Sequence, residues 1–279
     1  MNEILNSTNV EDNITIFNQW VMLIAFLTFI LLTFKEALTP LIKFDRKTTR
    51  DSIVTNSAAF IFNNIILSLF KVSSLFYIAQ EFSYLGLLSE MENGLEKWII
   101  AFLCYDLAIY AWHRYSHFNE TLWRLHKIHH SDRSFNVTTG FRFHMFDIFL
   151  ETLYKCFLIM ILGADVILIL SIELIHQVFI FFHHSNLKFN FEQKASKLII
   201  TPDLHRAHHS TKRDEHDSNY GIVLSIWDYI FKTRNVCVPK KIGLDLIEAE
   251  NFYQLFFLAF ISENKMRKLR QIFPKGKRN

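Results

Sequence analysis

The sequence predicts an all-α fold: a polytopic membrane helical bundle of about four or five spans with a cytoplasmic, histidine-rich, metal-binding helical cap. Composition is the first reason, since 51% of the 279 residues are hydrophobic and only 7 are Gly and 4 are Pro, which favours long helices. Apolar runs of spanning length are the second reason. The third is the grouping of the 13 His residues into short boxes.

The first two apolar runs, 14–34 and 52–70, contain no charged residue. At a rise of about 1.5 Å per residue, each is long enough for a helix to cross a hydrocarbon core of about 30 Å. Neither run contains a histidine. Residues 1–13 are predicted to form an N-terminal tail, and residues 14–97 to form membrane helices without metal ligands.

Three later runs, 98–112, 143–162 and 164–182, each carry one to three charged residues. Polar groups in membrane helices usually face a bundle interior or a site, so these helices are predicted to surround the functional centre. The stretch GAD, residues 163–165, where the last two runs meet, predicts the tip of a helical hairpin. Residues 239–279 are predicted to form an interfacial helix and a basic tail, with a simple solvated tail as the alternative.

Loop charges predict the orientation in the membrane. Residues 1–13 carry acidic side chains and no basic one, whereas the loop after the first run carries five basic residues: Lys35, Lys43, Arg46, Lys47 and Arg50. By the positive-inside rule the N-terminus lies outside, and the C-terminus and every histidine box lie in the cytoplasm. The membrane would be the bacterial cytoplasmic membrane, or the endoplasmic reticulum in a eukaryote.

Three histidine boxes follow: HRYSH at 113–117, HKIHH at 126–130 and HRAHH at 205–209. From composition alone, a given position opens H-x-x-H-H about once in ten thousand, so two copies are not chance. On a helix, positions i, i+3 and i+4 share a face, so the histidines of each box are expected to point one way. Thr201 as N-cap, Pro202 at the first position and Asp203 in the first turn predict a helix for the last box.

Eight imidazoles are too many for one metal, because a catalytic zinc takes three protein ligands, so two metals with about four ligands each are expected. Imidazole binds Zn, Fe, Cu or Ni, and the ligand type alone does not select the ion. The three cysteines show no C-x-x-C spacing and predict no thiolate site. The absence of H-E-x-x-H argues against a zincin peptidase.

Other polar residues are candidates for supporting roles. His184, with Asn186 as a partner, is the best additional ligand, while His144, His176, His183 and Asp203 are supporting residues or further candidate ligands. Asp106 shares a helix stripe with His113 and is expected either to orient a ligating imidazole or to pair with another helix. His216, in the charged stretch KRDEHDS, is expected to be solvated.

The boxes, together with HHSDRSFNVTTGFRFH, FFHHSN, TPDLHRAHHS, DSNYG and IWDYIFKT, resemble the fatty acid hydroxylase and sterol desaturase superfamily. The resemblance covers roughly residues 98–236 and is assigned to a domain of residues 98–238. It implies a non-haem centre of two Fe ions, O₂ as oxidant and electrons drawn indirectly from NAD(P)H. The implied ligands are His113, His117, His126, His129, His130, His205, His208 and His209, with His184 as the ninth. Ile180 stands where some members place another ligand, so His183 is a candidate replacement.

The expected activity is therefore the O₂-dependent hydroxylation or desaturation of a lipid, such as a sterol, fatty acyl or ether lipid. Electrons are expected from a separate cytochrome b5-, ferredoxin- or reductase-type donor. Two alternatives remain open: a histidine-rich membrane metal transporter or binding protein, and a zinc-dependent lipid hydrolase. A net charge of only +3 does not suggest a nucleic-acid partner.

Overall fold

A computed structural model describes the chain except for residues 1, 70–73, 246–248, 263–264, 266–267 and 269–279. The described residues form helices and loops, with two isolated β-bridges and no extended strand. The longer helices are α1 (Asn2–Leu38), α2 (Arg46–Leu69), α4 (Leu95–Phe118), α6 (Met145–Leu162) and α7 (Val166–His184). The shorter helices are α3 (Ser74–Phe82), α5 (Glu120–His126), α8 (Glu192–Ala195), α9 (Pro202–His208), α10 (Arg213–His216), α11 (Ile226–Ile230) and α12 (Phe252–Leu258). The predicted all-α fold is confirmed for these residues.

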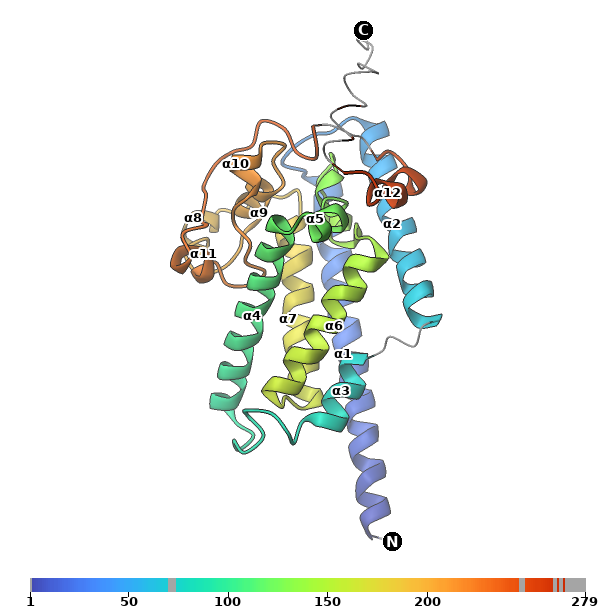
Figure 1. Ribbon diagram of the computed structural model, residues 1–279, viewed down its shortest axis with the longest axis vertical. Helices are drawn as coiled ribbons and strands as arrows, with labels where there is room; N and C mark the ends of the chain where they lie inside the picture. Colours follow the sequence, from blue (N-terminus) through green and yellow to red (C-terminus); the bar gives the residue numbers. More distant parts are fainter. Residues whose placement is uncertain (1, 70–73, 246–248, 263–264, 266–267, 269–279) are drawn as a thin grey trace.

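The long helices run side by side, and the short helices from α8 to α11 gather with α5 at one end of the bundle (Figure 1). That end lies opposite the N-terminal half of α1, which extends past the other helices. Two helical segments, Ile14–Leu38 and Val166–His184, are long and apolar enough to cross a membrane, with mean hydropathies of 2.1 and 2.0. The larger span count and the cytoplasmic side of the cap stay predictions.

The turn between α6 and α7 closes the end of the bundle opposite the cap. Gly163 ends α6 with φ 67°, a left-handed conformation that glycine adopts without steric cost. The Asp165 side chain then caps α7 by accepting a bond from the Leu168 N–H at 2.9 Å. Gly86 packs directly on this turn, where a Cβ would lie 1.9 Å from the Gly163 nitrogen. The predicted hairpin tip therefore forms, and the loop before α4 covers it.

Charged residues of the later apolar runs pair with one another. Lys155 on α6 lies 3.1 Å from Glu151 and 3.2 Å from Glu173 on α7, and the Tyr105 hydroxyl on α4 donates to Glu173. These pairs join three helices, which is how charges in an apolar bundle lower their desolvation cost.

At the C-terminal side, α12 packs on α2 through the rings of Phe252 and Phe62, whose centroids lie 5.0 Å apart. Leu255 and Leu258 are buried, whereas Tyr253 and Phe257 are exposed. Most of the predicted basic tail lies outside the described residues.

Candidate metal centre

Four elements bring the histidine boxes together at the capped end of the bundle. His113 and His117 occupy the last turns of α4, and His184 is the last residue of α7. The second box starts at the end of α5 and continues into a 3₁₀ turn, His129–Ser131. The third box lies on α9, with Thr201 at the N-cap position and Pro202 in the first turn, as predicted, although the Thr201 hydroxyl makes no capping bond.

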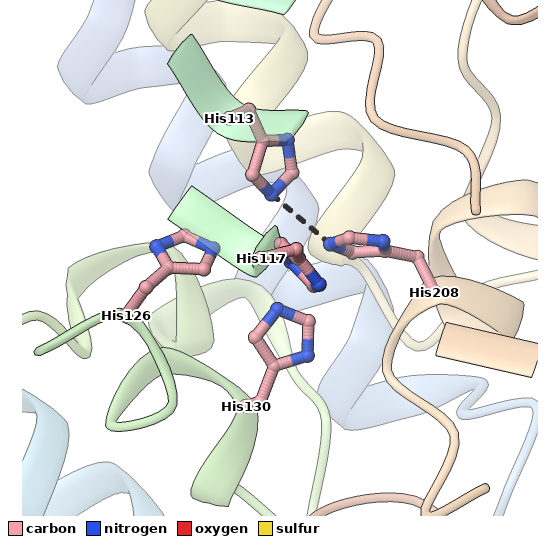
Figure 2. Close-up of side chains that lie close together, drawn as sticks. All are labelled: His113, His117, His126, His130 and His208. Atoms are coloured by element: carbon pink, nitrogen blue, oxygen red, sulfur yellow. Dashed lines mark hydrogen bonds between the residues drawn. The ribbon is translucent and has the colours of Figure 1, made fainter. Parts of the chain in front are cut away.

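Five buried histidines form a first cluster, in which one ligand atom from each residue lies within 4.8 Å of all the others: His113, His117, His126, His130 and His208. Figure 2 shows their rings converging from α4, from the second box and from α9. The Nε2 atoms of His113 and His208 lie 3.1 Å apart.

Four buried histidines form a second cluster by the same criterion: His129, His184, His205 and His209. The Nε2 atom of His184 lies 3.0 Å from those of His129 and His205, and the His205 and His209 Nε2 atoms lie 3.2 Å apart. The two clusters together contain the nine residues that the resemblance implies as ligands.

The second and third boxes are each divided between the two clusters, although the ring centroids within each box stay within 5.6 Å of one another. His126 and His130 join the first cluster, whereas His129 joins the second; likewise His208 separates from His205 and His209. Successive helical residues differ by about 100° around the axis, so adjacent histidines diverge even when both lie near one face. In the second box, the 3₁₀ turn adds to this divergence. As a result, two boxes each contribute to both clusters.

Hydrogen bonds to Nδ1 orient five of the rings. The Nδ1 atoms of His113, His184 and His208 lie 2.8, 2.7 and 2.6 Å from the carbonyl oxygens of Tyr220, Ile180 and Ser218, respectively. Because a carbonyl oxygen only accepts, Nδ1 of a neutral ring must carry the proton, which leaves the Nε2 lone pair free.

Carboxylates orient the other two of these five rings through their Nδ1 atoms. His117 Nδ1 lies 3.2 Å from Asp217 Oδ1, and His126 Nδ1 lies 3.2 Å from Asp147 Oδ2. Pairs of this type commonly fix metal-binding imidazoles.

The donor set fits a pair of metal ions. Several buried ring nitrogens have no hydrogen-bond partner among the described residues, including Nε2 of His117 and His126 and both nitrogens of His130. Two nitrogens bound at right angles to one metal, each at about 2.1 Å, would lie about 3.0 Å apart. The Nε2 separations of 3.0–3.2 Å match this value. A hydrogen bond between two of these nitrogens would give a partner only to that pair, whereas one metal cation can bind every nitrogen of a cluster.

Burial also keeps the cap histidines neutral. Loss of solvation, reinforced by the neighbouring imidazoles, lowers the pKa of five cap histidines well below the usual imidazole value: His129, His130, His205, His208 and His209. Neutral imidazole is the form that binds metals.

Asp106 lies away from both clusters. Its Oδ1 atom is 3.3 Å from His176 Nε2 on α7, and its carboxylate accepts bonds from Trp227 of α11 and from the loop before that helix. Of the two roles expected for Asp106, the structure supports pairing with another helix. His176 is thereby placed in the bundle interior, outside both clusters.

The other supporting candidates also lie outside the clusters. His144 caps α6, and the His183 ring packs beside His205 with centroids 3.9 Å apart. Asn186 holds the loop between α1 and α2 through the backbone of Ile42 instead of contacting His184. Asp203 pairs with Arg206 at 2.6 Å.

His216 is buried, which corrects the expectation that it is solvated. Its ring stacks on Trp123, with centroids 5.4 Å apart, and its Nδ1 atom lies 3.0 Å from the Ser210 carbonyl oxygen. His216 also forms a small group with His117 and Asp217. Lys212, Arg213 and Asp214 before it are exposed, whereas Asp217 after it turns inward to His117, because α10 is a single short turn with one buried face.

Four residues near the site were not found from the sequence. Asp147 and Asp217 orient cluster rings, and the buried Tyr220 ring lies 5.0 Å from that of His117. Glu36 at the end of α1 accepts bonds from the backbone N–H groups of Val137 and Asn186. Asp217 and Tyr220 both lie in the stretch DSNYG, which offered a local signal because it is part of the family resemblance.

Aromatic rings border the clusters. Phe143 stacks on His129, with centroids 4.4 Å apart and planes 10° apart, and it also lies 6.3 Å from His126. Phe143 is half-buried, whereas Phe135, on the other side of the second cluster, is fully buried. Phe143 therefore contacts both clusters and still faces outward. Its carbonyl accepts a bond from Asn63 of α2 at 2.9 Å.

Comparison with known proteins supports the resemblance. Residues 98–233 match the fatty acid hydroxylase family. The chain is 32% identical to the alkylglycerol monooxygenase of Homo sapiens over 137 residues, which are 49% of this chain and 30% of the human protein. It is 33% identical to an ornithine lipid hydroxylase of Rhizobium tropici over 149 residues, 50% of this chain and 43% of that protein. The chain thus matches less than half the length of these relatives. No solved structure matches it.

Proposed function

Since residues 98–233 match the fatty acid hydroxylase family, we propose that this protein is an integral membrane enzyme that hydroxylates a lipid with O₂ at a non-haem di-iron centre. The observation that carries the proposal is the pair of buried imidazole clusters at one end of an apolar helical bundle. The relatives named as lipid hydroxylating enzymes support hydroxylation over desaturation.

The clusters would hold one iron each, with five imidazoles available in the first and four in the second. When bound, the two ions would supply the activation of O₂. The protein provides the ligands, and it fixes the tautomers of five rings through Nδ1. Burial lowers the pKa of His129, His130, His205, His208 and His209, which favours their neutral, metal-binding form. Asp147 and Asp217 would also balance part of the charge of the ions.

Phe143 would separate the centre from the lipid. Its half-exposed ring contacts histidines of both clusters, so a hydrocarbon chain packed against its outer face would lie next to the metal pair. An apolar wall at this point excludes water, which would otherwise compete for the oxidant.

The overall reaction joins R–H, O₂, two electrons and two protons to give R–OH and H₂O. The electrons would come from NAD(P)H through a separate donor protein that approaches the cap from the cytoplasm. In this arrangement lipid arrives from the bilayer and electrons arrive from water. The N-terminus would accordingly face outward.

The test is a labelling assay. Membranes that contain the protein are supplied with NADPH, a reductase system and ¹⁸O₂, and the extracted lipids are measured by mass spectrometry. Label in a product hydroxyl supports hydroxylation, whereas loss of two mass units without label would indicate desaturation. Product that forms equally well under nitrogen would exclude both reactions.

The two alternatives predict different outcomes. A zinc-dependent hydrolase would contain zinc without iron and would act without O₂. A metal transporter requires a path for the ion, and its ionisable groups would lie near the bilayer midplane. The clusters lie at the capped end of the bundle with every ring buried, which favours a resident metal centre.

A further inference from the structure

Two segments that are distant in the sequence join into one platform at the edge of the cap. Residues 187–199 include α8, and residues 225–235 include α11; we call these two segments the foot. Ser225 links them, because its N–H donates to the Leu198 carbonyl at 3.0 Å and its hydroxyl donates to the Ser196 carbonyl at 2.9 Å. Arg234 adds a bond to the Ser196 hydroxyl at 3.2 Å. Figure 1 shows α8 and α11 beside each other on the side of the cap that faces the bundle.

The foot reaches down the side of α4. The Phe231 ring stacks on Tyr110 of α4, with centroids 5.4 Å apart, and Trp227 donates to Asp106 at 2.8 Å. Tyr110 precedes His113 and His117, the cluster residues of α4, by three and seven residues, or about 4.5 and 10.5 Å along the helix axis. The foot therefore lies closer to the middle of the bundle than the histidine clusters do, at the level where a surrounding bilayer would begin.

The outer surface of the foot is apolar. Six large side chains are between 40% and 67% exposed: Phe191, Leu198, Ile226, Tyr229, Ile230 and Phe231. In a protein dissolved in water, such a group would be an unusually large exposed apolar patch. Aromatic and aliphatic residues of this kind are typical where a protein meets the headgroup and acyl boundary of a bilayer.

The exposed charges of the foot have one sign. Lys188, Lys194, Lys197 and Lys232 are exposed, whereas the two acidic residues of the foot, Glu192 and Asp228, are 5% and 0% exposed. The Glu192 carboxylate accepts backbone bonds from Phe189 and Asp203, and the Asp228 carboxylate accepts bonds from Tyr220 and Gly221. Both carboxylates are thus used inside the fold, so the outer rim presents only positive charge.

We propose that the foot is a membrane-contact surface that inserts its apolar side chains into the bilayer boundary and binds anionic lipid headgroups through its lysines. The apolar patch and its basic rim match the two layers of an anionic membrane surface. A bilayer that surrounds the bundle would touch the foot without any further partner. Contact at this level fixes how deep the cap lies in the membrane. This role does not depend on which reaction the metal centre performs.

The test measures the depth of single spin labels in the full-length protein reconstituted in nanodiscs. Labels are placed at Leu198→Cys and Ile230→Cys after the three natural cysteines have been replaced by alanine. The matched control is Asp214→Cys, an exposed residue of α10, which is the helix on the side of the cap away from the bundle. We expect labels on the foot to collide mainly with O₂, which concentrates in the bilayer, and the control label to collide mainly with a water-soluble nickel chelate.

The charge requirement is tested with a second pair of variants. Lys188, Lys194, Lys197 and Lys232 are changed to Gln together, and Lys212, Lys240 and Lys241 are changed to Gln as the control. Each basic residue near an anionic surface changes partitioning by about fivefold. In nanodiscs that mix phosphatidylcholine and phosphatidylglycerol, the first variant should lose most of the phosphatidylglycerol enrichment around the protein. The control should keep it.

Equal nickel-chelate access at the foot and at Asp214→Cys would overturn the proposal. Spin–spin coupling that grows with protein concentration would instead show a second copy on the foot. Anionic enrichment that is identical in both lysine variants would remove the headgroup part of the proposal. None of these readouts depends on metal content or on lipid turnover, so a failure here is separable from a failure of the proposed function.

Discussion

The Nε2 atoms of His129 and His184 lie 3.0 Å apart, although 55 residues separate them in the chain. His129 comes from a 3₁₀ turn after α5, and His184 is the last residue of α7. His205 completes the arrangement from α9, with its Nε2 atom 3.0 Å from that of His184. Three separate elements must be in place before this cluster exists, so metal binding should report on the assembly of the cap.

Metal content should depend on each cluster separately. We expect about two irons per chain in protein purified without a metal-affinity tag, and about one after either His129→Ala or His208→Ala, since each change removes a ligand from a different cluster. His144→Ala is the control, because His144 is buried but lies outside both clusters. Elemental analysis measures the stoichiometry. One zinc and no iron in the unchanged protein would contradict the proposed redox chemistry.

Topology follows from the loop charges. Reporter fusions after residues 50, 95, 135, 163 and 240 should give signals inside, outside, inside, outside and inside, respectively. The structure is compatible with this order, because the residues after α1 and the histidine boxes lie at the same end of the bundle. An outside signal at residue 135 would place the clusters out of reach of a cytoplasmic electron donor.

Phe143 should control how efficiently oxidation reaches the lipid. Phe143→Ala opens the wall beside His129, so we expect product formed per O₂ consumed to fall about tenfold or more while the iron content stays unchanged. The measurement compares oxygen uptake with hydroxylated lipid. Phe157→Ala, an exposed position on α6, is the control and should behave like the unchanged protein. Equal losses in both variants would assign Phe143 a general packing role.

Asn56 should stabilise the junction between α2 and the cap. Its side chain accepts a bond from Arg142 at 2.8 Å and donates one to Asp132 at 2.9 Å, and all three residues are buried. Asn56→Leu removes both bonds and leaves each buried charge with one partner fewer. We expect the free energy of unfolding to fall by about 2–4 kcal/mol, because bonds to buried charged groups are expensive to lose.

Thermal unfolding followed by circular dichroism tests the Asn56 prediction. Asn64→Leu is the matched control, since Asn64 lies on the same helix but is exposed and, among the residues that the structure describes, bonds only to the Phe60 carbonyl four residues earlier. A similar melting temperature for the two variants would show that the Arg142 network contributes little.

The sequence by itself determined the helical class, the resemblance to the fatty acid hydroxylase family and the identity of the residues that gather at the centre. Composition and the apolar runs determine the helical class, because a chain in lipid must hydrogen-bond every backbone group internally and a helix does so. Local spacing decides much of the rest: Pro202 starts α9, and the repeated H-x-x-H-H pattern marks the residues of both clusters. These signals lie in short stretches of sequence, so they can be recognised without knowing how the helices pack.

Only the tertiary structure decided which histidines share a cluster, which carboxylates orient them and what lies beside them. Asp147 reaches His126 from 21 residues away, and Asp217 reaches His117 from 100 residues away. Asp106 shares a helix stripe with His113 but instead joins α4 to α7 and α11. His216 is buried despite its charged neighbours because Trp123 covers its ring. Long-range contacts of this kind depend on how helices cross and where each one ends, and the 3₁₀ turn after α5 shows that a single helix ending redirects two ligands.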